Sequence, residues 1–127
     1  MDILIVDDNE DYLGLIKEVL TKNGYTVHTA QDGQEGCDVL SEVDIDLIIS
    51  DIRMPRLDGL KLHAFAREME RFNKTKFIFV SGFTDLYADV IKLDPKLDFM
   101  LPKTTPVKDL LDMVDRLIFG QMKGAWI

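Results

Sequence analysis

Short runs of apolar residues, each closed by polar residues, constrain the fold of this chain more than any other feature. The run ILIV at 3–6 is uninterrupted and rich in β-branched side chains, and LIIS at 47–50 and KFIFV at 76–80 are similar. Such runs are typical of strands covered on both faces, as in a parallel sheet. Two further predicted strands complete the set, YTVHT at 25–29 and DFML at 98–101.

Between these strands, apolar residues recur at helical spacing. From Asn9 they follow one face of a helix until Gly24, a residue type that commonly ends helices. The other predicted helices span 33–42, 60–72, 85–92 and 107–119, and Gly120 is expected to cap the last one. Strands that alternate with helices through short connections predict an α/β fold, a doubly wound sandwich with five parallel strands.

The composition indicates one soluble domain. A chain of 127 residues, 46% of them hydrophobic, is long enough to bury one core. With 15 Lys and Arg against 23 Asp and Glu, the formal charge of −8 disfavours a basic face for nucleic acid. The single cysteine cannot form an internal disulfide, and no membrane-spanning run or secretory leader is visible. We therefore expect a cytoplasmic protein that binds neither nucleic acid nor membrane.

Polar residues with chemical potential follow the predicted strands at the points where they end. In chain order these residues are Asp7, Asp8, Asp51, Ser81 and Lys103. In doubly wound sheets the ligand site lies beyond the carboxyl ends of the strands, where neighbouring loops meet. We therefore expect these side chains to converge at one edge of the sheet.

Several carboxylates in one crevice raise one another's pKa unless a cation lies between them. Oxygen ligands without a supporting cluster of His or Cys favour a hard ion, and a site with few carboxylates suits Mg²⁺. His28 and His63 are interpreted as ordinary surface or core residues. Asp7 and Asp8 could instead serve only to stabilise the N-terminus of the following helix. That alternative leaves the acid at the end of another strand unexplained.

Four segments, IVDDNED, SDIRMPRLDG, FVSG and MLPK, occur in this order along the chain. Together they resemble the receiver domain of two-component response regulators, over essentially the whole sequence. The spacing agrees, because Ser81 and Lys103 follow Asp51 by 30 and 52 residues. The resemblance implies the flavodoxin-like fold, with strand order 2-1-3-4-5.

By this resemblance, Asp51 is the phosphoacceptor. Ser81 would hydrogen-bond one phosphoryl oxygen, and Lys103 would pair first with Asp51 and then with another phosphoryl oxygen. These roles suit phosphoryl transfer, which depends mainly on positioning and on neutralising charge on the phosphoryl oxygens. The chain would then not be an enzyme for a separate substrate, since it catalyses only the phosphorylation and dephosphorylation of its own aspartate.

The resemblance also implies a set of ligands for Mg²⁺. Asp8 would bind the ion directly, Asp7 mainly through water, Asp51 through its carboxylate and Arg53 through its backbone carbonyl. Pro55 and Gly59 are interpreted as turn residues that shape the chain after Asp51.

The segment around the last predicted strand, which transmits the signal in this family, departs from the family pattern. The family places an aromatic residue three positions before the lysine and a proline directly after it, but these positions hold Met100 and Thr104. Phe99 is displaced by one residue, which reverses its face on a strand. We expect Met100 to follow Ser81 during switching in place of Phe99. We also expect a trans bond between Lys103 and Thr104, because a cis bond before a residue other than proline costs about 2.5–4 kcal/mol.

The predicted receiver domain spans 1–120, with a C-terminal tail at 121–127. We expect no output domain after this tail, and we expect from the start at Met1 a stand-alone receiver more than a module excised from a larger chain. The implied partners are a sensor histidine kinase or phosphotransfer protein, docking near the first helix, and an unknown downstream target. A phosphorylation-dependent dimer is a further arrangement consistent with the family.

Three alternatives share parts of this pattern. A flavin-binding module of the same topology needs a phosphate cradle where DDNED would repel a phosphate. A dehalogenase-like phosphatase needs a second aspartate two residues after its nucleophile, and Arg53 stands there. The third alternative is a pseudo-receiver, which has the same fold but binds partners independently of phosphorylation.

Overall fold

The computed structural model describes residues 1–82 and 94–126, with side chains to residue 120. Its centre is one parallel sheet of five strands in the order β2-β1-β3-β4-β5. The strands are β1 (Asp2–Val6), β2 (Thr26–Ala30), β3 (Leu47–Asp51), β4 (Lys76–Ser81) and β5 (Asp98–Pro102). The predicted fold class, sheet and strand order are confirmed.

Apolar residues on alternate positions of each central strand build two separate cores. In β1, Leu4 and Val6 belong to one buried cluster, while Ile3 and Ile5 belong to the other. Successive side chains of a strand point to opposite faces, so an uninterrupted apolar run fills both cores at once. This explains why the runs 3–6 in β1 and 47–49 in β3 contain apolar residues alone.

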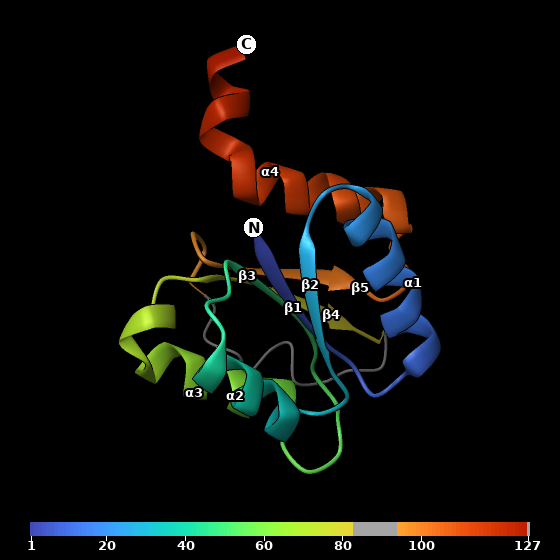
Figure 1. The fold of residues 1–127 in the computed structure, drawn as a ribbon, viewed down its shortest axis with the longest axis vertical. Coiled ribbons are helices and arrows are strands. Elements are labelled where there is room, and N and C mark those ends of the chain that lie inside the picture. The colour runs from blue at the N-terminus through green and yellow to red at the C-terminus, as the bar shows by residue number, and fades with distance from the viewer. Residues whose placement is uncertain (83–93, 127) are drawn as a thin grey trace.

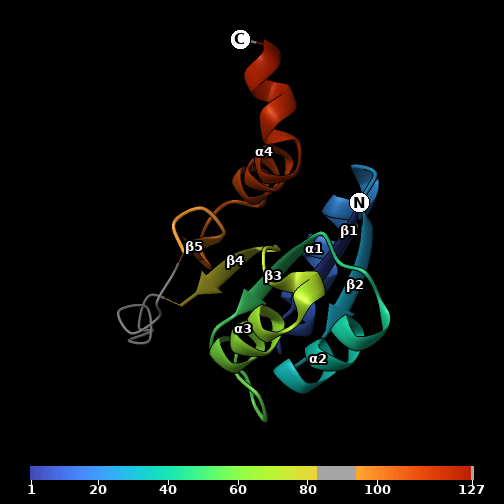
Figure 2. The same ribbon diagram turned by 90° about the vertical axis from the view of Figure 1, so that its left-hand side faces the viewer.

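Helices cover both faces of the sheet (Figures 1 and 2). The α-helices among the described residues are α1 (Glu10–Lys22), α2 (Gly33–Glu42), α3 (Gly59–Glu68) and α4 (Val107–Trp126). Helices α2 and α3 pack on the core that contains Leu4, whereas α1 and α4 pack on the core that contains Ile3. The N-cap residues of the first three helices are Asn9, Asp32 and Asp58, whose side chains each accept a hydrogen bond from a backbone N–H of the first turn.

The helix predicted over 60–72 is shorter than expected. Helix α3 ends at Glu68, because Met69 adopts an extended conformation and donates its N–H to the Ala66 carbonyl. A 3₁₀ turn, η1 (Glu70–Phe72), then buries Phe72, and the Arg67 guanidinium donates to the Phe72 carbonyl at 2.8 Å. Burial of this aromatic ring therefore outweighs the helical periodicity. The helix predicted over 85–92 lies outside the described residues.

The last helix also differs from the prediction, since α4 continues past Gly120 to Trp126. Its irregularity lies at Phe119, with φ −110° and ψ 19°. The ring of Phe119 stacks on Tyr25 with 6.4 Å between centroids, and the Lys76 ammonium donates to the Leu117 carbonyl at 2.9 Å. The first helical segment thus stops at Phe119, where the sequence predicts its end, but Gly120 does not close the element, because a second helical segment follows the kink and extends to Trp126.

A buried ionic cluster attaches the start of β5 to α3. Asp98, with a side chain only 1% exposed, accepts a hydrogen bond of 2.6 Å from Arg67 and lies 3.0 Å from Nε2 of His63. Its other oxygen accepts the Asp94 N–H at 2.8 Å. The cluster satisfies both oxygens of a carboxylate that would otherwise be costly to bury.

We predict that Asp98→Ala lowers the free energy of unfolding by about 3–5 kcal/mol, because it leaves the half-buried Arg67 guanidinium without its carboxylate. Urea denaturation monitored by circular dichroism measures the change. The matched control is Asp44→Ala, which removes the exposed partner of Arg71 and should cost at most about 1 kcal/mol. Equal losses in the two variants would contradict the assigned role of the cluster.

Candidate functional site

The carboxyl ends of four neighbouring strands meet at one edge of the sheet. Val6 pairs with Ser50, Asp51 with Val80, and Ser81 with Pro102. The residues at or just beyond these pairs are therefore brought together, although they are widely separated in the sequence. This edge holds Asp7, Asp51, Ser81 and Lys103, as the sequence predicts.

Lys103 is the centre of the contacts at this edge. Its Nζ lies 2.9 Å from Oδ2 and 3.1 Å from Oδ1 of Asp7, and 3.1 Å from Oδ2 of Asp51. Its backbone N–H donates to the Ser81 carbonyl at 2.7 Å, which fixes the point where the lysine leaves the sheet. One ammonium group thus connects the ends of β1, β3 and β5.

Burial and neighbouring charge perturb the titration of this group of residues. Burial raises the pKa of Asp51, and the carboxylate of Asp7 raises it further, while Lys103 acts in the opposite direction. Burial alone would lower the pKa of Lys103, but its contacts with Asp7 and Asp51 outweigh burial and raise that pKa. The ammonium form of the lysine is therefore the form that this edge stabilises.

Three carboxylates at this edge have the geometry of a metal site. One oxygen from each of Asp7, Asp8 and Asp51 lies within 4.8 Å of the others. Asp7 is buried, and the Lys103 ammonium lies 2.9 Å from its Oδ2, which has no other hydrogen-bond partner in the described structure, whereas Asp8 is exposed to solvent. An oxygen-only donor set that combines buried carboxylate oxygens with an open side fits a hard cation. Arg53, exposed on the loop after β3, is close to Asp51 in the sequence.

Contacts at two places hold the loop between β3 and α3. At Gly59, where the loop ends, a Cβ atom would lie 2.1 Å from the Asp51 carbonyl oxygen, so only glycine permits this close approach. Within the loop, the Leu57 carbonyl accepts the Gly33 N–H at 2.9 Å, and the Arg56 guanidinium pairs with buried Asp32. The loop that follows Asp51 therefore has its conformation set by the start of α2.

Sequence reasoning missed the contribution of α2 to this loop. Asp32 and Gly33 stand at the start of a predicted helix, where an acid followed by glycine could have been noticed as an N-cap. Their contact with Arg56 and Leu57 depends on the packing of two loops and carries no local pattern. Arg56 adopts φ 66°, a left-handed conformation that is uncommon for a residue other than glycine.

Tyr12 was also missed, because its apolar spacing was interpreted only as part of a helix face. Its ring lies under the Lys103 ammonium, with 5.1 Å between Nζ and the ring centroid. Burial and the negative charge of Asp7 both raise the pKa of Tyr12, so its hydroxyl is held neutral. Tyr12 is thus an additional residue at this edge.

Phe99 and Met100 lie on opposite faces of the sheet. Met100 packs against the core that contains Phe79, and Phe99 packs against the core that contains Ile78 and Leu110. The peptide bond between Lys103 and Thr104 is trans. The predicted register of β5 and the predicted bond geometry are therefore both present in the structure.

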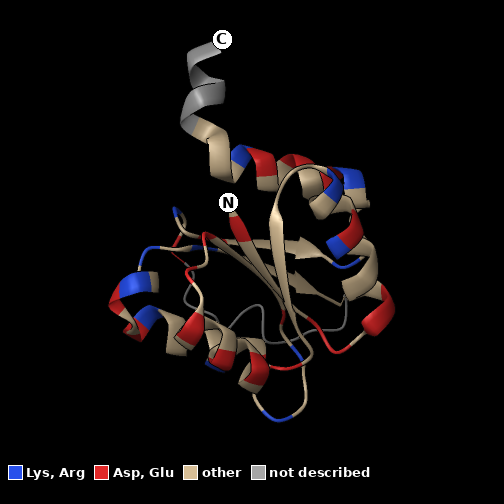
Figure 3. Cartoon of the chain, in the orientation of Figure 1, with Lys and Arg blue, Asp and Glu red and all other residues tan. Residues whose placement is uncertain are grey.

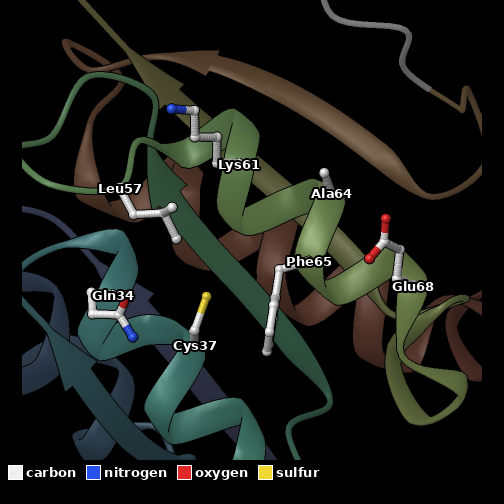
Figure 4. A pocket seen from close by; sticks show the side chains of 7 residues that line it. All are labelled: Gln34, Cys37, Leu57, Lys61, Ala64, Phe65 and Glu68. Carbon is white, nitrogen blue, oxygen red and sulfur yellow. The ribbon is translucent and has the colours of Figure 1, made fainter.

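A separate pocket of about 360 Å³ lies between α2 and α3 (Figure 4). Its lining combines the apolar side chains of Leu57 and Phe65 with Lys61 and Glu68, and none of the predicted site residues belongs to it. Cys37 also faces this pocket, and burial raises the pKa of its thiol, which disfavours the reactive thiolate. The chemistry of the chain is therefore concentrated at the edge of the sheet and not in this pocket.

The fold and this arrangement of acids and lysine together define a known class of protein. Residues 3–115 match the response regulator receiver domain family. The chain belongs to that family, whose members are regulatory modules of two-component signalling that operate with sensor histidine kinases.

Similar curated proteins include both kinases and regulators. The chain is 34% identical over 123 residues to the sensor kinase CckA of Brucella abortus. The match covers 94% of this chain and 12% of the kinase. The chain is 33% identical over 117 residues to the response regulator MprA of Mycolicibacterium vanbaalenii, covering 91% of this chain and 49% of that regulator. The chain thus spans half or less of the length of these relatives.

Solved structures of receiver domains superpose over nearly the whole chain. A CheY-like response regulator receiver domain protein from Methanospirillum hungatei has a TM-score of 0.84 at 29% identity, with 97% of both chains covered. The receiver domain of a signal transduction histidine kinase from Syntrophus aciditrophicus has a TM-score of 0.83 at 29% identity, covering 94% of this chain and 90% of that one.

We predict that Gly59→Ala lowers the free energy of unfolding by about 1–3 kcal/mol, because the added methyl group must displace the backbone at Asp51. Guanidinium denaturation measures the loss. Gly14→Ala is the control, because a Cβ at this position in α1 meets nothing within 4 Å. Alanine there should stabilise the helix by about 0.5–1 kcal/mol. If Gly59→Ala is as stable as the wild type, the close approach is not a constraint.

Proposed function

We propose that this chain is a phosphoacceptor receiver that takes a phosphoryl group onto Asp51 with the help of Mg²⁺. The observation that carries the proposal is the position of Lys103, whose ammonium contacts both Asp7 and Asp51 at the carboxyl edge of the sheet. A positive charge beside the nucleophile and an acidic cluster beside the lysine are the two elements that transfer of a phosphoryl group to a carboxylate requires.

The proposed reaction exchanges one bond to phosphorus for another. A carboxylate oxygen of Asp51 forms a bond to phosphorus while the bond to the donor's histidine nitrogen breaks, and the nitrogen keeps that electron pair and takes up a proton. Oδ1 of Asp51 accepts the Ile52 N–H at 2.7 Å, which leaves Oδ2, now paired with Lys103, as the oxygen that attacks. Lys103 and Ser81 then stabilise the phosphoryl oxygens.

The proposed ligands of Mg²⁺ are Asp7, Asp8 and Asp51, with the backbone carbonyl of Arg53. The closeness of one oxygen from each of these carboxylates supports the first three. When bound, Mg²⁺ would supply positive charge that neutralises the carboxylates and the phosphoryl oxygens. The protein's own contribution is to hold these oxygens close together before the ion arrives.

The alternative function is that of a pseudo-receiver, which would bind partners without phosphorylation. Such a protein has no need to keep the acids, the lysine and the serine at one edge. In this chain all of these residue types are present and Lys103 contacts two of the acids, so the phosphoacceptor function is favoured.

The proposed setting is a phosphorelay in the cytoplasm. We propose a sensor histidine kinase or phosphotransfer protein as the donor, a downstream protein as the target, and dimerisation on phosphorylation as one form of output. Nucleic acid is not a proposed partner, since the charge is −8 and Lys and Arg are interspersed with Asp and Glu over the helices (Figure 3). Among the described residues, no helix has the length and apolar character needed to cross a bilayer. We assign 1–120 to the receiver and 121–127 to its tail.

We predict that Asp51→Asn abolishes uptake of a phosphoryl group, because an amide cannot form the acyl phosphate. Incubation with acetyl phosphate and Mg²⁺, followed by intact-protein mass spectrometry, measures the added mass. The control is Asp58→Asn, which changes a nearby carboxylate at the N-cap of α3 for another good capping residue. Phosphorylation of the Asp51→Asn variant to the wild-type extent would overturn the assignment.

A second test concerns the metal. Added Mg²⁺ should raise the melting temperature of the wild type by mass action on the folded state, since it relieves repulsion among the three carboxylates. Asp8→Ala should remove most of this dependence, whereas Asp11→Ala, an exposed acid in the first turn of α1, should leave it intact. Differential scanning calorimetry across a magnesium titration checks both results, and an unresponsive wild type would rule out the shared site.

For the output, we propose that Met100 and not Phe99 responds to Ser81 when Asp51 is phosphorylated. Met100 occupies the face of β5 that packs against Phe79, and its flexible side chain can adopt more than one arrangement. Phe99 faces the opposite core and contributes to the packing of α4. Thus we assign switching and packing to adjacent residues of one strand.

We predict that Met100→Ala weakens the spread of amide chemical-shift changes that a beryllofluoride phosphoryl mimic causes across β5 and α4. Phe99→Ala should lower the free energy of unfolding, by no more than about 3–5 kcal/mol, but preserve the spread of shift changes. Two-dimensional NMR with and without the mimic compares the variants. If Phe99→Ala silences the response while Met100→Ala does not, the aromatic residue is the switch.

A further inference from the structure

Sequence spacing assigns Tyr12 only to the apolar face of a helix, but in the structure this residue also lies beside the candidate site. It lies in the first turn of α1, where its backbone N–H donates to Oδ1 of the N-cap residue Asn9 at 3.1 Å. Its side chain is half-buried and packs against the core that contains Leu13 and Ile16. The backbone and the side chain of Tyr12 are therefore both held in place independently of any contact with the site.

The ring of Tyr12 also faces the charged end of Lys103. The ring centroid is 5.1 Å from Nζ, within the range in which the negative face of an aromatic ring attracts an ammonium group. The same ammonium group pairs with Asp7 and Asp51, and the lysine side chain remains 27% exposed. The ammonium is thus held by two carboxylates and by an aromatic ring.

We propose that Tyr12 is a positioning residue that keeps the Lys103 ammonium at Asp51 for phosphoryl transfer. This inference rests on the proposed function of the site. A lysine has a long flexible stem, and ordering it at a reaction centre costs conformational entropy. The ring contact favours the lysine conformation in which the ammonium lies 3.1 Å from Asp51, so that less of this entropy cost remains to be met during the reaction.

The attraction comes from the ring and not from the hydroxyl group, which gives the proposal a sharp test. Tyr12→Phe keeps the ring, whereas Tyr12→Leu keeps an apolar side chain without a π face. We expect Tyr12→Phe to be phosphorylated by acetyl phosphate at the wild-type rate. Tyr12→Leu should be slower by about two- to thirty-fold, the range that corresponds to the strength of a cation–π contact.

A matched control separates positioning from loss of stability. Tyr25 belongs to the same core as Tyr12, but its hydroxyl donates to Asp115 and it has no contact with Lys103 among those that the structure describes. Tyr25→Leu should therefore destabilise the protein without slowing phosphorylation at a temperature where it remains folded. Slowing in both leucine variants to the same extent would overturn the proposal, as would equal rates for Tyr12→Leu and the wild type, or a slow Tyr12→Phe.

A second measurement does not depend on phosphorylation. An aromatic ring shifts the NMR signals of protons above its face upfield, so the ε-methylene protons of Lys103 should be displaced upfield in the wild type and Tyr12→Phe and return toward ordinary values in Tyr12→Leu. Absence of the displacement in the wild type would overturn the proposal even if Tyr12→Leu fails to fold. If the displacement is present but the wild type accepts no phosphoryl group, the ring contact stands, and the proposed function and the catalytic role of Tyr12 fail together.

Discussion

The ammonium of Lys103 is the charge on which the carboxyl edge of the sheet depends. Asp7 and Asp51 are both buried, and two carboxylates so close together would be driven toward protonation without a cation beside them. Lys103 provides that cation from the end of β5, and the Ser81 carbonyl fixes its backbone. Strand pairing and charge pairing therefore support each other. The sheet brings the two carboxylates together, and the lysine offsets the repulsion between them.

Because the carboxyl edge depends on Lys103, the proposed phosphorylation would affect the structure around this lysine. A phosphoryl group on Asp51 would add negative charge beside Lys103 and compete with Asp7 for the ammonium. Lys103 directly follows β5, so a shift of its side chain acts on the strand that carries Met100 and Phe99. Since these two residues pack into different cores, one strand links the chemistry to the helices on both faces of the sheet.

The sequence predicts most of the fold because local patterns encode it. Apolar runs identified all five strands, the family resemblance implied their order, and acids at strand ends predicted the edge where the carboxylates converge. Errors occurred where tertiary packing overrides local pattern. Burial of Phe72 ends α3 early, and the kink of α4 at Phe119, whose ring stacks on Tyr25, is followed by a further helical segment where a glycine cap had been expected. Neither effect leaves a mark within a short window of sequence.

The contacts that sequence reasoning missed at the site share one physical property. Tyr12 under Lys103 and Asp32 beside Arg56 each join residues from different loops or helices, and each involves a residue type that has an ordinary role in its own segment. An aromatic residue on a helix face and an acid at a helix start are already explained by local structure. Their second role exists only after the sheet has brought the strand ends together. The acids and the lysine of such an edge can thus be predicted from sequence, while the residues that contact them from other elements become visible only in the folded chain.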